Sequence, residues 1–394
     1  MKASITLADR LRHIDASPTL ALAAKAKALV KAGKAVLDFT AGEPDVPTPA
    51  HIKEAGMAAI RAEQTKYTPV AGIPELRAAV AASVNRLRQT SYQPAQALVT
   101  CGTKHALYNV FQALCQPGDE VIVFSPYWVS FPPLVHLAGA APVIVETQEA
   151  QGFLPEPAAV AAALTDVTKA IILNSPSNPT GAVIDADRLR AIAQLARARE
   201  LLIVSDEIYD QLVYPPARHV SILQAAPEVL DRTVIVGGVS KTYSMTGWRI
   251  GYAVGPQPWI DAMTNIQSHS TSNPTSISQH AALAALTGDQ APVGEMLQEF
   301  QRRRDRLVQG LNRLAPLRCP TPGGAFYAWC NVKGLGGSSE AIAARWLEEA
   351  QIAVVPGEGF GAPGYLRFSF ATSLETIDQA LERLRSWLDK RTTR

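Results

Sequence analysis

Short apolar runs alternate with amphipathic stretches through the middle of the chain. From Ala97 to about residue 255, each run has the length of a strand, and the segments between runs have the periodicity of a helix with one apolar face. The runs from Ala170 to Leu173 and from Leu201 to Val204 are apolar throughout, as strands must be when helices cover both faces of their sheet. The alternation predicts a mostly parallel, doubly wound α/β sheet with strands at 97–100, 120–124, 142–146, 169–173, 201–205 and 233–236.

The two ends of the chain carry a different pattern. A strand is predicted at 36–40, and helices are predicted to begin near Pro49 and Pro74, where the missing N–H of proline costs no hydrogen bond. Beyond residue 255 helical periodicity prevails, and we interpret the charged run from Glu299 to Leu307 as the solvated face of a long helix. Short strands are then predicted near 325–330, 352–355 and 365–370.

The length of 394 residues exceeds what one hydrophobic core serves, since cores stop growing near ~250–300 residues. We therefore expect two domains. The elements at both ends would form a small α+β domain from residues 1–45 and 301–394, and residues 46–300 would form the large α/β domain.

The composition is that of a soluble globular protein, with 47% hydrophobic and 18% charged residues. The formal net charge of +2 gives no basic excess for a nucleic-acid partner. No apolar run reaches the ~18–20 residues that span a membrane. The first residues mix charges of both signs and lack an apolar signal core, so a cytoplasmic location is expected.

Cysteines and histidines indicate neither a disulfide scaffold nor a metal site. The 4 cysteines lack close ligand spacing, and the 7 histidines are scattered, so no metal is expected. The glycine-rich segment from Gly357 to Gly361 lacks the strand–helix context of a dinucleotide-binding motif and is interpreted as a loop.

Residues capable of chemistry directly follow the predicted strands. Ligands of open parallel sheets bind beyond the carboxyl ends of the strands, so these residues are expected to share one edge. Each segment alone has an ordinary explanation as a turn or core packing, but their convergence predicts a ligand site that includes a helix N-terminus suited to an anion. The segments are Cys101 to Lys104, Ser125 to Trp128, Asn174 to Gly181, Ser205 to Tyr209 and Gly238 to Gly251.

With these segments in view, the sequence resembles the class I, fold-type I aminotransferases that use pyridoxal 5'-phosphate. The stretch from Gly238 to Gly251 fits the lysine signature of that family, and the segments from Asn178 to Gly181 and from Ser205 to Tyr209 fit two further hallmarks in the same order. The resemblance extends from Thr40 to Phe370 and is closest to the bacterial-type aspartate aminotransferases. It implies that the large domain binds the cofactor and that the protein is an enzyme with amino acid and 2-oxo acid substrates.

The resemblance assigns the cofactor ring to five residues. Lys241 would form the Schiff base with the cofactor aldehyde and shuttle the substrate proton. Asp206 would keep the pyridine nitrogen protonated. Asn178 and Tyr209 would bind the phenolic oxygen, and Trp128 would pack against the ring.

The cofactor phosphate would be bound by a second group of residues. Arg249 would contact the phosphate through two parallel hydrogen bonds. Tyr67 resembles the tyrosine that reaches the phosphate of the neighbouring subunit, which implies a homodimer with a shared active site. The remaining phosphate ligands would be Ser240 and the backbone of Gly102, Thr103 and Lys104.

Substrate recognition would depend on two cations. Arg367 matches the arginine that binds the substrate α-carboxylate, and Gly42 would bring backbone close beside it. Lys104 matches the lysine that binds the side-chain carboxylate of aspartate, so the expected reaction is L-aspartate plus 2-oxoglutarate to oxaloacetate plus L-glutamate. Trp128 and Asn178 would also line the substrate site.

Other specificities and one other function remain as alternatives. The same chemistry on an aromatic, kynurenine, alanine or prephenate/arogenate substrate is the first. Prephenate is disfavoured, because an ungapped alignment places Asp15 where relatives that accept it carry a lysine. A DNA-binding regulator that reuses this fold would need an extra basic N-terminal module, and only about 40 residues precede Gly42.

Overall fold

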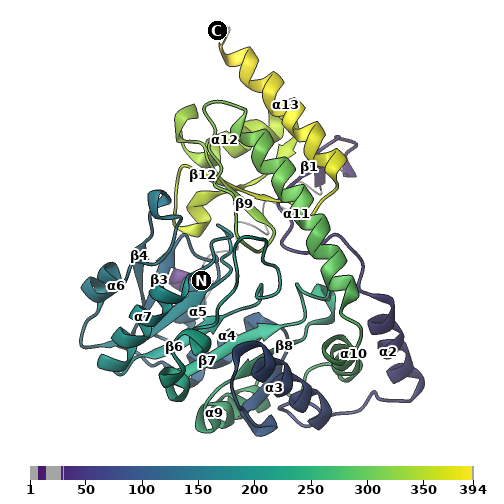
Figure 1. Cartoon of the computed structure of the whole chain (residues 1–394), viewed down its shortest axis with the longest axis vertical. Coiled ribbons are helices and arrows are strands. Elements are labelled where there is room, and N and C mark those ends of the chain that lie inside the picture. The colour runs from purple at the N-terminus through teal and green to yellow at the C-terminus, as the bar shows by residue number, and fades with distance from the viewer. Residues whose placement is uncertain (1–7, 15–27, 30, 393–394) are drawn as a thin grey trace, which may run out of the picture.

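A seven-stranded sheet organises the larger part of the molecule, shown in the lower half of Figure 1. The structure is a computed structural model that describes residues 8–14, 28–29 and 31–392. The strand order is β2-β8-β7-β6-β5-β3-β4, and every neighbouring pair is parallel except the two that involve β8. The strands are β2 (Ala97–Thr100), β3 (Glu120–Ser125), β4 (Ala141–Glu146), β5 (Thr168–Asn174), β6 (Leu202–Asp206), β7 (Thr233–Gly238) and β8 (Gly251–Val254).

Alternate residues of the central strands enter two separate cores. In β5, Ala170 and Ile172 pack into one core, whereas Ile171 and Leu173 pack into the other. Both faces are therefore buried, which confirms the fold class expected from the uninterrupted apolar runs. We call this sheet with its covering helices the large lobe. The helices are α2 (Ala50–Arg61), α3 (Pro74–Arg88), α4 (Thr103–Leu114), α5 (Phe131–Leu137), α6 (Pro157–Ala163), α7 (Ala186–Ala198), α8 (Ile222–Ala225), α9 (Gln257–Ser268) and α10 (Ser276–Thr287).

Two small sheets organise the remaining part, which we call the small lobe and which lies above the large lobe in Figure 1. The antiparallel sheet has the order β11-β12-β9, and β1 pairs in parallel with β10. Because Leu37 pairs with Ile352, the two ends of the chain are joined here. The elements are β1 (Leu37–Asp38), β9 (Tyr327–Asn331), β10 (Ile352–Ala353), β11 (Val355–Pro356), β12 (Tyr365–Ser369), α11 (Ala291–Asn312), α12 (Ser339–Arg345) and α13 (Leu374–Thr392). Whether the domains divide at residues 45 and 300 remains a prediction.

The shorter helical turns connect these elements. They are the 3-10 turns η1 (Asp9–His13), η2 (Pro94–Gln96), η3 (Glu149–Gln151), η4 (Pro227–Arg232), η5 (Thr246–Trp248), η6 (Lys333–Leu335) and η8 (Gly357–Phe360), together with the π-helical turn η7 (Trp346–Ala350).

Three local expectations were wrong. The strand β8 was not predicted, because a strand of four residues that begins with a glycine gives little hydrophobic periodicity. The segment from Gly357 to Gly361 is not a plain loop, since it contains η8 and buries Phe360. The run from Glu299 to Leu307 is not wholly solvated, because Arg303 and Arg304 are buried in α11.

Each buried arginine of α11 has a partner that explains its position. Arg303 donates to Asp45 at 2.7 Å and to Glu299 at 2.9 Å. Arg304 lies over the ring of Tyr214, with its guanidinium carbon 4.7 Å from the ring centroid. A long cationic side chain can thus occupy the apolar face when an anion or an aromatic ring meets its head.

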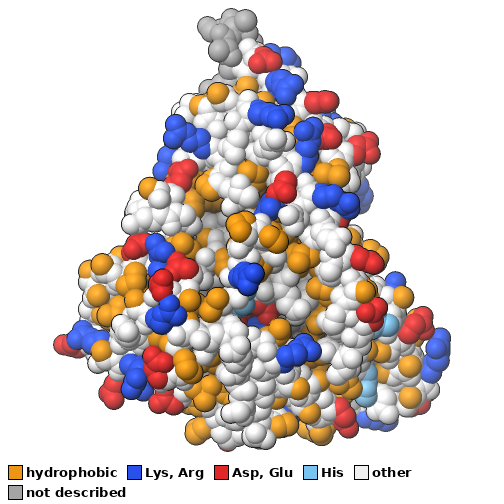
Figure 2. Space-filling view, viewed as in Figure 1, with side chains coloured by type: hydrophobic (Ala, Val, Ile, Leu, Met, Phe, Trp, Pro, Cys, Tyr) orange, Lys and Arg blue, Asp and Glu red, His pale blue; other side chains and the backbone are white. Residues whose placement is uncertain are grey.

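The structure also describes the surface charges, the cysteines and the potential metal ligands. Acidic and basic side chains are interspersed on the face in Figure 2. All four cysteines are free thiols. Within the described residues no helix is both long and apolar enough to cross a membrane, and no cluster of potential metal ligands occurs.

Candidate active site

The carboxyl ends of β2, β3, β5, β6 and β7 point the same way, because only β8 runs against its neighbours. The sequence-predicted residues that follow these strands therefore gather at one edge of the large lobe. The small lobe closes over that edge through β9, β12 and the segment around Gly42. The face in Figure 2 is hollowed where the two lobes meet.

Asp206 ends β6 and is buried, with 3% of its surface exposed. Its carboxylate accepts a hydrogen bond from the backbone of Ile208 at 3.2 Å. Burial raises the pKa of Asp206 to about 7, and the neighbouring carboxylate of Glu207 adds to the shift. A cationic partner would strongly stabilise the ionised form of a carboxylate that is buried in this way.

Lys241 follows β7 and reaches across to the small lobe. Its ammonium donates a hydrogen bond to the backbone carbonyl of Gly42. Burial lowers the pKa of Lys241 to about 8, and the cations Arg367 and Arg249 lower it further against the attraction of Glu43. The lowered pKa raises the fraction of neutral amine near physiological pH above that of an ordinary lysine, as a nucleophile or proton carrier requires.

Arg249 lies against the start of α4 and has an unusual backbone. Its φ of 57° is in the left-handed region, which few non-glycine residues adopt, and it ends the turn η5. Its guanidinium donates to the carbonyl of Thr246 at 3.0 Å and faces Gly102, the residue that precedes α4. A Cβ at Gly102 would displace the Arg249 guanidinium, and the φ of 85° at this position also favours glycine. The N-terminus of α4 and the guanidinium thus place positive charge together, an arrangement suited to an anion.

Lys104 and Trp128 contact each other beside the start of α4. The Lys104 ammonium lies 5.0 Å from the centroid of the Trp128 ring. Burial and the nearby Arg249 both lower the pKa of Lys104. Thr103 donates its hydroxyl to the Gly237 carbonyl at 3.0 Å, which fixes the first turn of α4 to β7.

Arg367 enters the site from β12 and is 2% exposed. It donates to Asn178 Oδ1 at 2.9 Å and to the carbonyl of Thr40 at 3.0 Å. Among the described residues its Nε is a buried nitrogen without a hydrogen-bond partner. Burial lowers the pKa of Arg367, and this penalty on a cation would be relieved by an anion in the site.

Tyr209, Asn178 and Ser240 are also brought to this edge and are buried. The Tyr209 hydroxyl lies 3.0 Å from the hydroxyl of Tyr327. Tyr327 comes from β9 and was not among the predicted site residues. Its place is visible only once β9 and β12 are paired, because nothing in a strand tyrosine marks it as functional.

Tyr67 is the predicted residue that the fold does not bring to this edge. It lies in the loop after α2 and is 90% exposed, so its side chain makes little contact within its own chain.

A buried ionic network beside Asp206 was not predicted from the sequence. Arg88 donates to Glu207 at 2.9 Å and to Asp210 at 2.6 Å. Glu207 further accepts from Ser221 at 2.7 Å, and Arg88 holds its pKa down to about 2 although burial opposes this. The network anchors the end of α3 to the end of β6.

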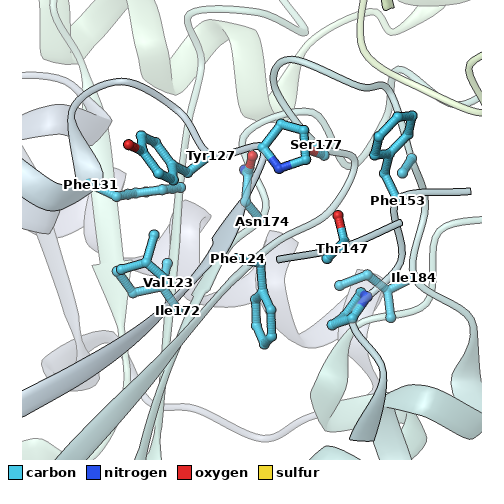
Figure 3. Close-up of a pocket in the computed structure, with 13 residues that line it drawn as sticks. Val123, Phe124, Tyr127, Phe131, Thr147, Phe153, Ile172, Asn174, Ser177 and Ile184 are labelled. Atoms are coloured by element: carbon cyan, nitrogen blue, oxygen red, sulfur yellow. The ribbon is translucent and has the colours of Figure 1, made fainter. Parts of the chain in front are cut away.

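A narrow apolar pocket, drawn in Figure 3, is lined by residues of β3 and β5 and of the segments that follow them. Side chains of Val123, Ile172 and Phe131 line it, together with the polar Asn174 at the end of β5. Asn174 accepts from the Asn178 backbone at 3.0 Å, so the pocket supports the loop that carries Asn178. None of the predicted site residues lines this pocket.

Comparisons with known proteins identify the family. The model of the family "Aminotransferase class I and II" matches residues 34–384. An aspartate aminotransferase of Geobacillus stearothermophilus is 47% identical over 98% of this chain and 99% of its own length. An aspartate/prephenate aminotransferase of Thermus thermophilus is 47% identical over 96% of this chain and 97% of its own.

Solved structures agree with the sequence relatives. The structure of aspartate aminotransferase from Thermus thermophilus with maleate has a TM-score of 0.94 at 45% identity and covers 97% of this chain and 99% of that one. The chain therefore belongs to the class I and II aminotransferases and has the fold-type I architecture of enzymes that use pyridoxal 5'-phosphate.

Proposed function

We propose that this aminotransferase moves the amino group of L-aspartate to 2-oxoglutarate and forms oxaloacetate and L-glutamate. The observation that carries the proposal is a pair of cations in one site. Arg367 is buried on the small-lobe side, and Lys104 lies at the start of α4 on the large-lobe side. A dicarboxylic amino acid would bind each of these two cations with one of its carboxylates.

The residues present fit pyridoxal 5'-phosphate. Gly102 and Arg249 form a cradle that a Cβ would fill, which suits a phosphate at the start of α4. The carboxylate of Asp206 lacks a cation at hydrogen-bond distance among the described residues, and a protonated ring nitrogen would supply it. Asn178 and Tyr209 would bind the phenolic oxygen, and Trp128 would pack on the ring.

The cofactor, when bound, supplies an electron sink for the bond broken at the substrate Cα. The protein supplies orientation and proton transfer. Lys241 Nζ, with its lowered pKa, accepts the Cα proton and returns it to the product side. Arg367 and Asn178 orient the α-carboxylate, so the Cα–H bond faces Lys241.

Substitution of Lys241 tests the reaction. We expect the wild-type protein reconstituted with pyridoxal 5'-phosphate to absorb in the visible and to catalyse transamination. Lys241→Ala should lose the visible band and at least ~10³-fold in kcat, because nucleophile and proton carrier disappear together. Lys53→Ala, on the exposed face of α2, is the matched control and should keep both. A wild-type protein that gives no visible band would contradict the proposal.

Substitution of Lys104 tests the substrate. Lys104→Met should raise KM for aspartate by roughly 10-fold or more, because a carboxylate loses its charged partner, and should leave KM for alanine nearly unchanged. Equal effects on both amino acids would overturn the preference for aspartate.

Prephenate is a second candidate because a 47%-identical relative is named for both substrates. The residue on which the sequence argument against it rested, Asp15, lies outside the described residues. Prephenate should therefore be included among the amino acceptors, with turnover well below that of 2-oxoglutarate as the expected result.

A homodimer with shared active sites is part of the proposal. The 90% exposure of Tyr67 supports it, because a tyrosine projecting this far is placed to enter a partner's phosphate site. Analytical ultracentrifugation should show a dimer. The four free thiols support a cytoplasmic location, which cell fractionation would check.

A further inference from the structure

Tyr327 lies between two residues with separate tasks in the proposed reaction. Its hydroxyl is 3.0 Å from the hydroxyl of Tyr209, and the two rings meet edge to face, with centroids 5.9 Å apart. On the other side the guanidinium carbon of Arg367 lies 4.3 Å from the centroid of the Tyr327 ring. A Cβ built on Gly42 would also lie 3.7 Å from the Tyr327 hydroxyl.

The strand register places these groups together. In the antiparallel pair of β9 with β12, Arg367 faces Trp329 and Tyr327 faces Ser369. Arg367 and Tyr327 are therefore diagonal neighbours two positions apart, close enough for long side chains to touch. Tyr327 is 1% exposed, so water does not compete for its hydroxyl.

We propose that Tyr327 is a positioning residue that donates its hydroxyl hydrogen to Tyr209 and links the carboxylate-binding Arg367 to the ring-binding Tyr209. The inference rests on the proposed function, in which Tyr209 donates to the phenolic oxygen of the cofactor. A hydroxyl that accepts one hydrogen bond becomes a stronger donor in the next. Tyr327 thereby strengthens the bond from Tyr209 to that oxygen.

The alternative hydrogen-bond direction is disfavoured by geometry. The Arg367 cation lies against the ring of Tyr327 and draws electron density from it, which makes the Tyr327 hydroxyl the better donor. The charged and titratable groups that act on Tyr209 are Tyr327 itself, Arg367 from β12 and Asp206 from β6, and those that act on Tyr327 are Arg367 and Tyr209. The pair thus meets the Arg367 cation from the small lobe and the Asp206 carboxylate from the large lobe.

The experiment is a pH titration of the visible absorbance of the holoenzyme. Tyr209→Phe should raise the midpoint pH of this titration. The phenolic oxygen of the cofactor would lose a hydrogen-bond donor and would therefore hold a proton more tightly. Tyr327→Phe should raise the midpoint in the same direction by less, with a loss of roughly threefold to tenfold in kcat. The double substitution should match Tyr209→Phe alone, because Tyr327 acts through Tyr209.

Two further variants separate this role from loss of packing. Tyr214→Phe removes another buried hydroxyl, which donates to the Ala325 carbonyl at 2.6 Å, and should leave the midpoint unchanged. Replacement of Tyr327 by 3-fluorotyrosine keeps the ring in place and makes its hydroxyl a stronger donor, so the midpoint should fall. This variant decides the question even if Tyr327→Phe does not fold.

An unchanged midpoint in Tyr327→Phe or in the 3-fluorotyrosine protein would overturn the inference. Additive shifts in the double variant would also overturn it, as would a shift in Tyr214→Phe. These failures differ from failure of the proposed function, in which the wild-type protein would show no visible band to titrate.

Discussion

Arg367 donates a hydrogen bond of 2.9 Å to Asn178, a residue 189 positions earlier in the chain. The bond joins β12 of the small lobe to the loop after β5 of the large lobe. A substrate carboxylate that binds Arg367 would compete with Asn178 for the same guanidinium. Under the proposed function, substrate binding would therefore change a contact that joins the two lobes, which provides a physical route from binding to closure of the lobes.

Gly102→Ala should weaken cofactor binding by ~10-fold or more, because its Cβ would displace the Arg249 guanidinium 2.4 Å away. Gly118→Ala is a matched control, since Gly118 also has a positive φ, of 98°, but nothing lies within 4 Å of its Cβ. Both variants should lose ~1 kcal/mol of stability from backbone strain. Titration of the apo-proteins with pyridoxal 5'-phosphate measures the difference, and equal affinities would contradict the assigned anion site.

Lys241→Met should stabilise the cofactor-free protein at pH 7 by roughly 1–3 kcal/mol. The pKa of Lys241 falls from its ordinary 10.5 to about 8 on folding, so folding releases a proton between these values. The free-energy cost of burying the charged amine is therefore complete below pH 8 and fades as the pH rises to 10.5. Urea unfolding across this range should show the advantage of the variant shrinking, whereas Lys53→Met should show no such trend.

Arg88→Met should destabilise the protein by ~3–5 kcal/mol, because Glu207 and Asp210 would lose their buried cation. Arg190 on α7 forms an exposed pair with Asp187, so Arg190→Met should change stability by no more than ~0.5 kcal/mol. Urea denaturation compares the two variants. A small effect at Arg88 would show that the network tolerates an unpaired carboxylate.

Tyr67→Phe should weaken cofactor binding by ~10-fold, because the phosphate would lose one hydrogen bond to a charged group. In a mixed dimer with Lys241→Ala chains, the Lys241 of the Tyr67→Phe chain would meet an intact Tyr67 from its partner. Its affinity should then return to the wild-type value. Weak binding that persists in the mixed dimers would rule out sharing of Tyr67 between subunits.

The main sheet could be predicted because its strands are buried on both faces and are therefore apolar without interruption, as β5 illustrates. The short strand β8 gave no such signal, and its pairing depends on contacts with β2 and β7 that are distant in sequence. The buried positions of Arg303 and Arg304 likewise depend on Asp45 and Tyr214, which only the fold brings near.

The site could be located because its residues follow strands whose ends share one edge, as Asp206 and Lys241 do. Their individual roles came from family resemblance and remain to be tested by the substitutions above. The roles of Tyr327 and of the Arg88–Glu207 pair could not be predicted, because 118 positions separate Tyr327 from Tyr209 and 119 positions separate Arg88 from Glu207. No local pattern reports such long-range pairs.

The reversed direction of β8 has a consequence for how this enzyme can change. The connection between β7 and β8 carries both Lys241 and Arg249, and its ends are tied by the bond from Val239 N to the Ile250 carbonyl at 3.4 Å. A slip of one residue in that pairing would move Lys241 and Arg249 together, the two residues proposed to bind the aldehyde and the phosphate of the cofactor. Inherited or engineered insertions in this connection should abolish catalysis in a single step. New substrate specificities can arise instead through changes in other segments that face the substrate.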